Sequence, residues 1–284
     1  MCRGGTGPRL PGTPRGLVLG REQRLSPPGS SVSFRRMDRT RWEEIRRVGA
    51  LIDRFKAKPL ERRRRLLQVH GISLVLDVGA NTGQYARGLR RAGYRGRIVS
   101  FEPVRSAFAR LRRAAATDKR WTVERLALGR RDGTATIHVS GDSRASSMLP
   151  MLPAHREVAG YFGTVADEEV EIRRLDSVFD RYVRPSDRVL LKLDVQGLEP
   201  QVLDGARASL ARVAGIQIEL SLTPLYRGEL GIVPMLGRLQ RAGFALMSLE
   251  YGFCNPKTGQ MLQVDGLLFR PLTDGARAPR APRR

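Results

Sequence analysis

The chain has 284 residues, 51 of them basic and 28 acidic, with a formal net charge of +23 and 41% hydrophobic residues. This length suits one α/β domain with extensions or two small domains, and the apolar content excludes a disordered or fibrous chain. The sequence contains no run of ~18 apolar residues, which excludes a membrane-spanning helix, and no apolar stretch typical of a secretory signal near its start. Two cysteines, Cys2 and Cys254, are too few for a disulfide framework or a zinc site, so a reducing cytoplasmic location is expected.

The positive charge is concentrated near the start of the sequence. Residues 1–70 hold 18 basic and 6 acidic residues, whereas the 200 residues 71–270 hold 29 and 21. Only five of the 51 basic residues are lysine, a bias that a GC-rich genome produces without any partner. A dedicated nucleic-acid surface is therefore the less favoured reading, although a basic protein can also bind anionic lipid.

The first 70 residues divide into two parts. Residues 1–36 are rich in Gly, Pro, Ser and Arg and are expected to form a disordered basic tail. Met37 begins a different segment and is a candidate translation start. Residues 37–70 are expected to form an N-terminal helical cap that includes a helix over Leu60–Val69. The alternative for this segment is an amphipathic helix on a membrane surface, given its apolar positions at Ile45, Val48, Ile52 and Phe55.

Residues 71–270 alternate short apolar runs with helical patterns, which predicts an α/β domain with a parallel sheet covered on both faces. Residues 271–284 form a second tail, also expected to be disordered. The expected strands are Leu74–Val78, Ile98–Phe101, Thr122–Leu126, Val189–Asp194 and Gly215–Leu220. The expected helices are Gln84–Ala92, Arg105–Ala116, Glu199–Val213 and Val233–Ala242.

Two regions break this alternation. Strands over Phe244–Tyr251 and Met261–Phe269, joined by a turn with Pro256 and Gly259, are expected to pair as a hairpin. Residues 134–180 have an irregular pattern, with expected strands at Thr134–Val139 and Val170–Arg174 around a polar loop.

A glycine-rich turn follows the first buried strand. Gly79 and Gly83 allow a tight turn and a close approach of a ligand to the main chain. The spacing differs from that of dinucleotide binders, because Asn81 stands where their second glycine lies. Asp77 at the strand end would also repel a pyrophosphate. A ligand with a positive or zwitterionic part, such as S-adenosylmethionine, suits this turn better.

The next strand ends in an acidic residue, Glu102, about twenty residues after the glycine turn. A carboxylate at that place accepts hydrogen bonds from both hydroxyls of a ribose. The order and spacing of the two features predict a site for a nucleoside cofactor.

Several motifs together resemble the FkbM family of methyltransferases, over roughly residues 71–270. The resemblance implies a Rossmann-like, seven-stranded, mostly parallel sheet whose last strand is antiparallel, the class I methyltransferase fold. It also implies S-adenosylmethionine as cofactor, and acceptors such as the hydroxyls of macrolides, sugars and deoxyhexoses of mycobacterial glycolipids. The motifs are Asp77-Val-Gly-Ala-Asn-Thr-Gly83, Phe101-Glu-Pro103, Ala127-Leu-Gly129, Leu191-Lys-Leu-Asp-Val-Gln-Gly-Leu-Glu199 and Val264-Asp-Gly-Leu-Leu-Phe269.

The resemblance also implies cofactor-binding residues. Asp77, Gly79, Asn81 and Gly83 correspond to the loop around the methionine part of the cofactor, and Glu102 corresponds to the ribose ligand. One departure concerns position 196, where the family often has Glu and this chain has Gln196. That change leaves an acid–base role at this position in doubt.

A sugar hydroxyl needs a base or a metal before it attacks a methyl group. Asp194 and Glu219 each follow an apolar strand and are the leading catalytic candidates, with Glu199 and Asp265 next. The alternative is that Asp194, Glu219 and Asp265 bind a divalent cation through their oxygens. A third interpretation is that Asp194 and Glu199 only cap the helix that follows.

The acceptor pocket is expected to include the loop 142–148 and the region Tyr161–Gly163. His70 and His138 are expected to be structural or exposed, as is His155 unless its loop folds over the site. The expected acceptor is a small molecule or a glycolipid, with peripheral membrane contact as an open alternative. The oligomeric state does not follow from the sequence.

Two other functions remain as alternatives. The charge suggests a nucleic-acid methyltransferase, but an Asn/Asp-Pro-Pro-aromatic motif is missing after the fourth strand, where the chain reads Asp194-Val-Gln-Gly197. The basic N-terminus also lacks interleaved aromatic residues for base stacking. The second alternative is an inactive module of the same fold that residues 39–65 tether to anionic lipid. An NAD-dependent dehydrogenase is disfavoured by the glycine spacing.

Overall fold

The computed structural model describes residues 59–140, 147–150, 152 and 164–272. The expectations for residues 1–58 and 273–284 lie outside this part of the chain. Seven strands form one sheet in the order β3-β2-β1-β7-β8-β10-β9. Their bounds are β1 Leu74–Val78, β2 Arg97–Phe101, β3 Trp121–Glu124, β7 Val189–Leu193, β8 Val213–Ser221, β9 Ala245–Tyr251 and β10 Gln263–Phe269.

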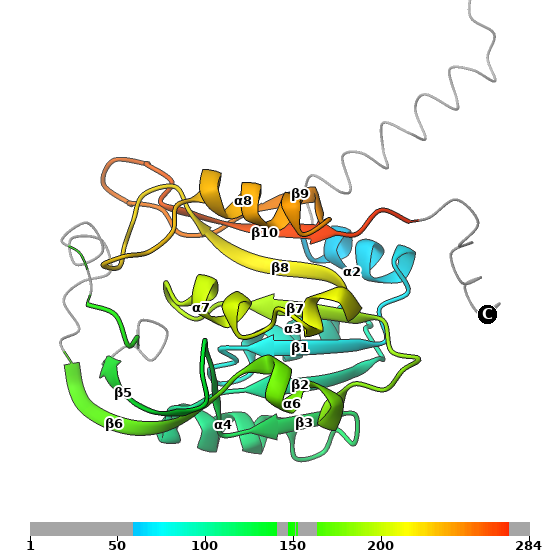
Figure 1. The fold of residues 1–284 in the computed structure, drawn as a ribbon, viewed down its shortest axis with the longest axis horizontal. Coiled ribbons are helices and arrows are strands. Elements are labelled where there is room, and N and C mark those ends of the chain that lie inside the picture. Colours follow the sequence, from blue (N-terminus) through cyan, green and yellow to red (C-terminus); the bar gives the residue numbers. More distant parts are fainter. Residues whose placement is uncertain (1–58, 141–146, 151, 153–163, 273–284) are drawn as a thin grey trace, which may run out of the picture. The chain divides into compact units, whose positions relative to one another are not determined.

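The direction of the strands confirms the predicted topology. β3, β2, β1, β7 and β8 pair in parallel, whereas β10 is antiparallel to both β8 and β9. The parallel strands end toward the left in Figure 1, and β10 runs the other way. Because β7 pairs with β1 rather than with β3, the order reverses between β1 and β7, and ligands bind at the carboxyl ends of strands beside such a reversal.

Helices cover the sheet on both faces, because each buried strand is apolar on both sides. In β1, Leu74 and Leu76 belong to one core and Val75 to the other. The core around Val75 takes side chains from α2, α3 and α4, and the opposite core takes them from α6, α7 and α8. In Figure 1, α6 and α7 lie in front of the sheet and α3 behind it. The helices are α2 Pro59–Val69, α3 Gln84–Arg91, α4 Arg105–Ala115, α6 Leu175–Tyr182, α7 Glu199–Asp204 and α8 Ile232–Arg241.

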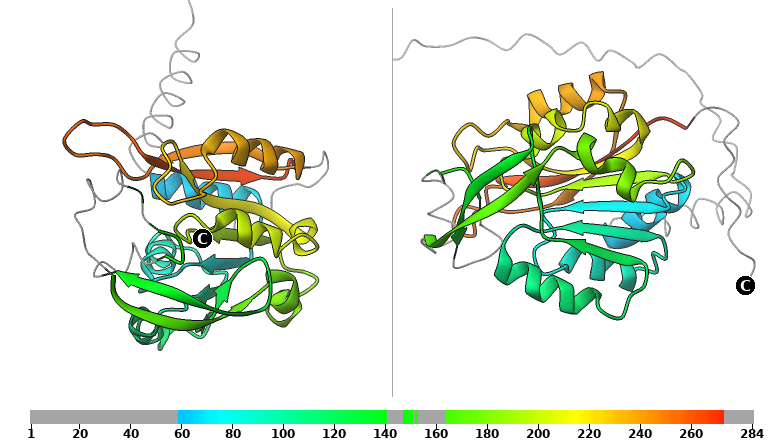
Figure 2. Two further views of the ribbon diagram at one scale, coloured as in Figure 1. Left: turned by 60° about the vertical axis from the view of Figure 1, so that its left-hand side comes forward. Right: turned by 60° about the horizontal axis from the view of Figure 1, so that its bottom comes forward.

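Both strands expected within residues 134–180 are present: the one over Thr134–Val139 is confirmed, and the one over Val170–Arg174 is the end of a longer strand whose first six residues, 164–169, were expected to be loop. β5 (Gly133–Ser140) and β6 (Thr164–Arg173) pair antiparallel over most of their length, and Figure 2 shows them side by side. With β4 (Ala127–Leu128) they form a second sheet in the order β4-β6-β5. The helix α6 was also missed, although Leu175, Phe179 and Tyr182 are spaced as on one helix face and are buried.

The expected helix over Glu199–Val213 was wrong in its second half. α7 ends at Asp204, a short 3₁₀ helix covers Ser209–Arg212, and Val213 begins β8. Gly205 packs so tightly that a Cβ there would lie 2.0 Å from the carbonyl oxygen of Gly129. The carboxylate of Asp176 then accepts hydrogen bonds from the backbone at 208 and 209, which starts the second turn separately.

The predicted helix over Leu60–Val69 is confirmed as α2. Within the described residues, no helix is both long enough and apolar enough to span a membrane.

Candidate active site

The glycine-rich turn after β1 has the left-handed backbone that its sequence predicts. φ is +75° at Gly79, +49° at Asn81 and +83° at Gly83. A Cβ on Gly79 would lie 1.9 Å from the carbonyl oxygen of Asp194, so only glycine lets the two chain segments approach this closely. The turn after β1 and the residue after β7 therefore form one continuous edge.

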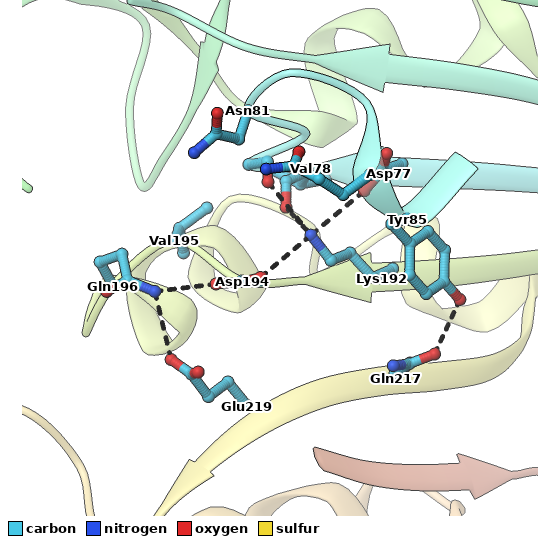
Figure 3. Close-up of polar contacts among 12 residues, drawn as sticks. Asp77, Val78, Asn81, Tyr85, Lys192, Asp194, Val195, Gln196, Gln217 and Glu219 are labelled. Atoms are coloured by element: carbon cyan, nitrogen blue, oxygen red, sulfur yellow. Dashed lines mark hydrogen bonds and ion pairs between the residues drawn. The ribbon is translucent and has the colours of Figure 1, made fainter. Parts of the chain in front are cut away.

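A buried lysine joins these two segments. Lys192 lies inside β7, and its ammonium is 3.2 Å from the carboxylate of Asp77 and 3.3 Å from that of Asp194 (Figure 3). The same ammonium donates a hydrogen bond of 3.1 Å to the carbonyl oxygen of Gly79. Burial opposes its charge, but Asp194 and Asp77 outweigh this effect and raise the pKa of Lys192. Lys192 is thus a fixed cation beneath the glycine turn.

Asp77 lies within the sheet and has no exposed surface. Besides Lys192, it accepts a hydrogen bond of 3.0 Å from the hydroxyl of Ser100, which in turn accepts one from the indole of Trp121. The structure therefore places Asp77 under the turn, where it holds Lys192. The predicted contact between Asp77 and a cofactor stays a prediction.

Glu102 follows β2 and turns its carboxylate toward the glycine turn. One oxygen accepts the N–H of Asn81 at 2.8 Å and the other accepts the N–H of Val104 at 2.9 Å. Burial raises the pKa of Glu102 to about 7, and these two hydrogen bonds oppose the rise. Each oxygen keeps a second lone pair, so the carboxylate can still accept the two hydroxyls of a ribose.

Gln196 connects the two leading catalytic candidates. Its amide nitrogen donates to Asp194 at 2.9 Å and to Glu219 at 3.3 Å (Figure 3). Its amide oxygen accepts a hydrogen bond of 2.6 Å from the hydroxyl of Tyr226. A glutamate at position 196 has no such donor and would place a third carboxyl group between the other two.

Asp194 and Glu219 differ in their surroundings. The side chain of Asp194 is 40% exposed, so an acceptor molecule can reach it. Glu219 lies deeper, where it also accepts a hydrogen bond of 2.8 Å from Gln263. Burial, followed by the charge of Asp194, raises the pKa of Glu219 well above its usual range. Glu219 therefore holds its proton to higher pH than an exposed glutamate does, and Asp194 is the carboxylate that an acceptor can reach.

The two lower-ranked candidates lie on either side of this pair. Glu199 is buried at the start of α7 and accepts the N–H of Val195 at 2.8 Å, in the loop before the helix, so this bond does not cap α7. Asp265 lies opposite Glu219 in the β8–β10 pair. Burial raises its pKa to about 6. A catalytic role for Glu199 or Asp265 stays a prediction.

The suggested cation site at Asp194, Glu219 and Asp265 does not form in this structure. Across the described ranges, no group of three or more His, Cys, Asp or Glu side chains is arranged to hold a metal ion. The amide nitrogen of Gln196 lies between two of the three carboxyl groups instead.

Residues 147–149, which follow β5 in the chain, reach the site. The hydroxyl of Ser147 donates a hydrogen bond of 2.9 Å to the carbonyl oxygen of Gln196. Leu149 packs beside Tyr226, and a Cβ on Gly197 would lie within 3.2 Å of each. This supports an acceptor pocket near residues 147–149. Residues 142–146 and 161–163 of the predicted pocket, and His155, lie outside the described residues.

His70 and His138 do not line the site. His70 is buried and stacks on the ring of Phe269 at a centroid distance of 4.1 Å. The exposed His138 lies 2.7 Å from the carboxylate of Asp167. Both positions agree with the expected structural or exposed roles.

Sequence reasoning missed Lys192, Tyr226 and Gln263 as parts of the site. A lysine within the apolar run of β7 is a signal that was available, because a buried charge needs a partner. Tyr226 and Gln263 gave no comparable signal, since their contacts join segments 30 and 44 residues apart in sequence.

The sheet order, the glycine turn and the acidic residue after β2 define the chain as a class I methyltransferase. The profile of the FkbM methyltransferase domain matches residues 77–249, which is more than half of the chain. The protein belongs to the FkbM methyltransferase family and is an S-adenosylmethionine-dependent enzyme.

A curated relative and two solved structures are similar to this chain. The relative is the 2-O-methyltransferase NoeI of Sinorhizobium fredii, 28% identical over 172 residues that make up 58% of this chain and 70% of the relative. An rRNA methylase from Streptococcus thermophilus has a TM-score of 0.39 at 12% identity and covers 71% of this chain and 89% of its own. A magnesium protoporphyrin IX methyltransferase from Synechocystis with bound S-adenosylmethionine has a TM-score of 0.40 at 10% identity. The match covers 70% of this chain and 71% of that protein.

The residues present fit this cofactor. Glu102 has the free lone pairs that a ribose needs, and it is already fixed against the glycine turn through Asn81. The carboxylate of Asp194 at the edge of the same turn suits a ligand with a positive centre.

Proposed function

We propose that the protein transfers a methyl group to a hydroxyl of a sugar, in a small molecule or a glycolipid. The cofactor supplies an electrophilic methyl group on a sulfonium. The name of the similar NoeI protein, a 2-O-methyltransferase, supports oxygen as the accepting atom. The observation that carries the proposal is the half-exposed carboxylate of Asp194 beside the glycine turn, backed by Lys192.

Asp194 is the group that takes the proton from the acceptor hydroxyl. It lies beside the glycine turn, so an acceptor bound there would place its hydroxyl within reach of this carboxylate, and the cofactor would supply the methyl group. Lys192 and the amide of Gln196 fix its two oxygens. Glu219, held through Gln196, positions this assembly, and Asp194 alone of the two is exposed enough to meet the acceptor.

Leu149, which is partly exposed and packs on the buried ring of Tyr226, provides an apolar wall beside these polar groups. A sugar has an apolar face as well as hydroxyls, so a wall of this kind next to a carboxylate suits it. The acceptor therefore lies between Asp194 and the segment that begins at Ser147.

The test is transfer of a labelled methyl group from S-adenosylmethionine to defined acceptors: glycosides with single free hydroxyls, their fully blocked counterparts, and RNA. We expect label on glycosides with one particular hydroxyl free and none on the blocked compounds. Label on RNA alone, or no label on any glycoside while the cofactor binds, would contradict the proposed acceptor class.

A further inference from the structure

The arginines of this protein are distributed unequally between the two helical layers. Residues 59–120, which include α2, α3 and α4, contain fifteen basic and four acidic residues. Residues 175–212, which include α6 and α7 on the opposite face, contain six of each, and α8 adds two arginines. A genomic bias toward arginine would act on both layers alike, so it does not explain this difference.

The negative charges of residues 59–120 do not balance the basic ones at the surface. Asp77 and Glu102 are buried, and Asp118 forms an ion pair with Arg90 at 2.6 Å. The fourth, Glu61, is only partly exposed. Ten basic side chains of this segment are exposed, and we call them the basic face: Arg65, Arg87, Arg91, Arg95, Arg105, Arg110, Arg112, Arg113, Lys119 and Arg120.

We propose that the basic face binds the surface of a membrane that contains anionic lipids. Guanidinium groups bind phosphate with two parallel hydrogen bonds, and a cluster of them is attracted to a negatively charged bilayer. Seven of these ten residues lie on α2, α3 and α4, which pack on the same core on one side of the sheet, and the other three, Arg95, Lys119 and Arg120, lie in the turns after α3 and α4.

Two observations favour lipid over nucleic acid. The aromatic residues of the segment, Tyr85, Tyr94, Phe101 and Phe108, are buried or partly buried, so none is exposed for stacking on bases. The sequence directly before α2 also carries apolar residues at helical spacing between basic ones, including Ile45, Val48, Ile52 and Phe55. Apolar and basic residues in this combination suit a lipid surface.

The experiment is co-sedimentation of the full chain with vesicles of phosphatidylcholine and phosphatidylglycerol in equal parts, and with pure phosphatidylcholine vesicles. The variant Arg87→Gln/Arg91→Gln/Arg110→Gln removes three charges from the basic face. The control variant Arg184→Gln/Arg207→Gln/Arg241→Gln removes three exposed charges from the opposite layer. The N-terminal residues are the same in all three proteins, and no methyl transfer is needed.

We expect the wild type to bind only the anionic vesicles. The first variant should lose about 100-fold in its partition coefficient and the control much less, because each basic residue near an anionic surface contributes separately. Equal losses in both variants, no effect in either, or no binding by the wild type would each overturn the proposal. So would tighter binding to duplex RNA with the same loss in the first variant, which would make the basic face a nucleic-acid surface.

Discussion

At the candidate active site, single residues hold the carboxylates in place. Lys192 holds the two carboxylates Asp77 and Asp194, and Gln196 links Asp194 to Glu219. A chain with Lys192 inside an apolar strand is stable because both opposite charges lie within 3.3 Å. The position of Asp194, the proposed base, therefore depends on residues that do not themselves contact the substrate.

The first prediction concerns Asp194→Asn. Asparagine keeps the size of the side chain and an oxygen that can accept a hydrogen bond, but it cannot take a proton. We expect kcat to fall by about 10²–10⁴-fold, the usual effect of losing a general base, while S-adenosylmethionine still raises the unfolding midpoint. Steady-state kinetics and thermal unfolding measure the two effects. The matched control is Asp167→Asn, an exposed position in β6, and full turnover by Asp194→Asn would remove this residue from the mechanism.

The second prediction concerns Glu199, whose pKa burial raises to about 7 from 4.5. The folded state then binds a proton that the unfolded state has released, so this group stabilises the fold below about pH 4.5 and the effect is lost as the pH rises through 7. Between about pH 4.5 and 7 the unfolding free energy of the wild type should fall because of this group. Glu199→Gln cannot ionise, so its unfolding free energy should fall by roughly 1 to 3 kcal/mol less over the same range. Urea unfolding at several pH values measures this.

Glu169→Gln, at an exposed position in β6, is the control and should follow the wild type. If the Glu199→Gln protein shows the same pH dependence as the wild type, then burial does not raise the pKa of Glu199, which would contradict the prediction.

At the scale of elements, a buried ion pair fixes α2 to β9, the edge strand of the sheet. Arg63 pairs with Glu250 of β9, and their side chains are 14% and 3% exposed. Arg63 also lies 5.1 Å from the ring centre of Tyr85 at the start of α3. The helix thereby joins β9 to the helix that follows the glycine turn.

The third prediction follows from this pair. Arg63→Met leaves Glu250 buried without its partner, and we expect a loss of about 3 kcal/mol in unfolding free energy. The double variant Arg63→Met/Glu250→Gln should regain much of this loss, because no unpaired charge remains. Arg65→Met, on an exposed position of the same helix, should change stability little. Urea unfolding of the wild type, the single variants Arg63→Met and Glu250→Gln, and the double variant gives the coupling, and additive losses would contradict the buried pair.

The sequence predicted the sheet better than the segments around it. β1, β7 and β8 are apolar on both faces, so their runs are visible without knowledge of their neighbours. The first six residues of β6 were missed because acidic residues such as Glu168 and Glu169 made them resemble a polar loop, while the partner strand β5 lies earlier in the chain. α7 was drawn too long because the packing of Gly205 against Gly129, which stops it, joins distant segments.

The same limit applies to the site. Gly79, Gly83 and Glu102 were predicted because turn geometry and strand ends are local properties. The bridging role of Gln196 depends on Glu219 and Tyr226, which come from other strands and loops. Only the assembled sheet brings these groups within hydrogen-bonding distance.

For the whole molecule, the two proposed functions, methyl transfer and lipid binding, lie in different parts of the fold. The candidate methyl-transfer site lies at the carboxyl ends of the parallel strands, and most of the basic face lies on α2, α3 and α4. The first function depends on the cofactor, so binding of the cofactor is the central claim.

The measurement that tests this claim most directly is thermal unfolding of the full chain with S-adenosylmethionine, with its demethylated product, and with NAD. At 100 times its dissociation constant a ligand adds about 2.7 kcal/mol, which corresponds to a rise of about 5 °C in a chain of this size. We predict that rise with the first two ligands and not with NAD, and a smaller one in Glu102→Gln, which loses a carboxylate oxygen for the ribose. No rise with either S-adenosyl compound, or an equal rise with NAD, would contradict the account.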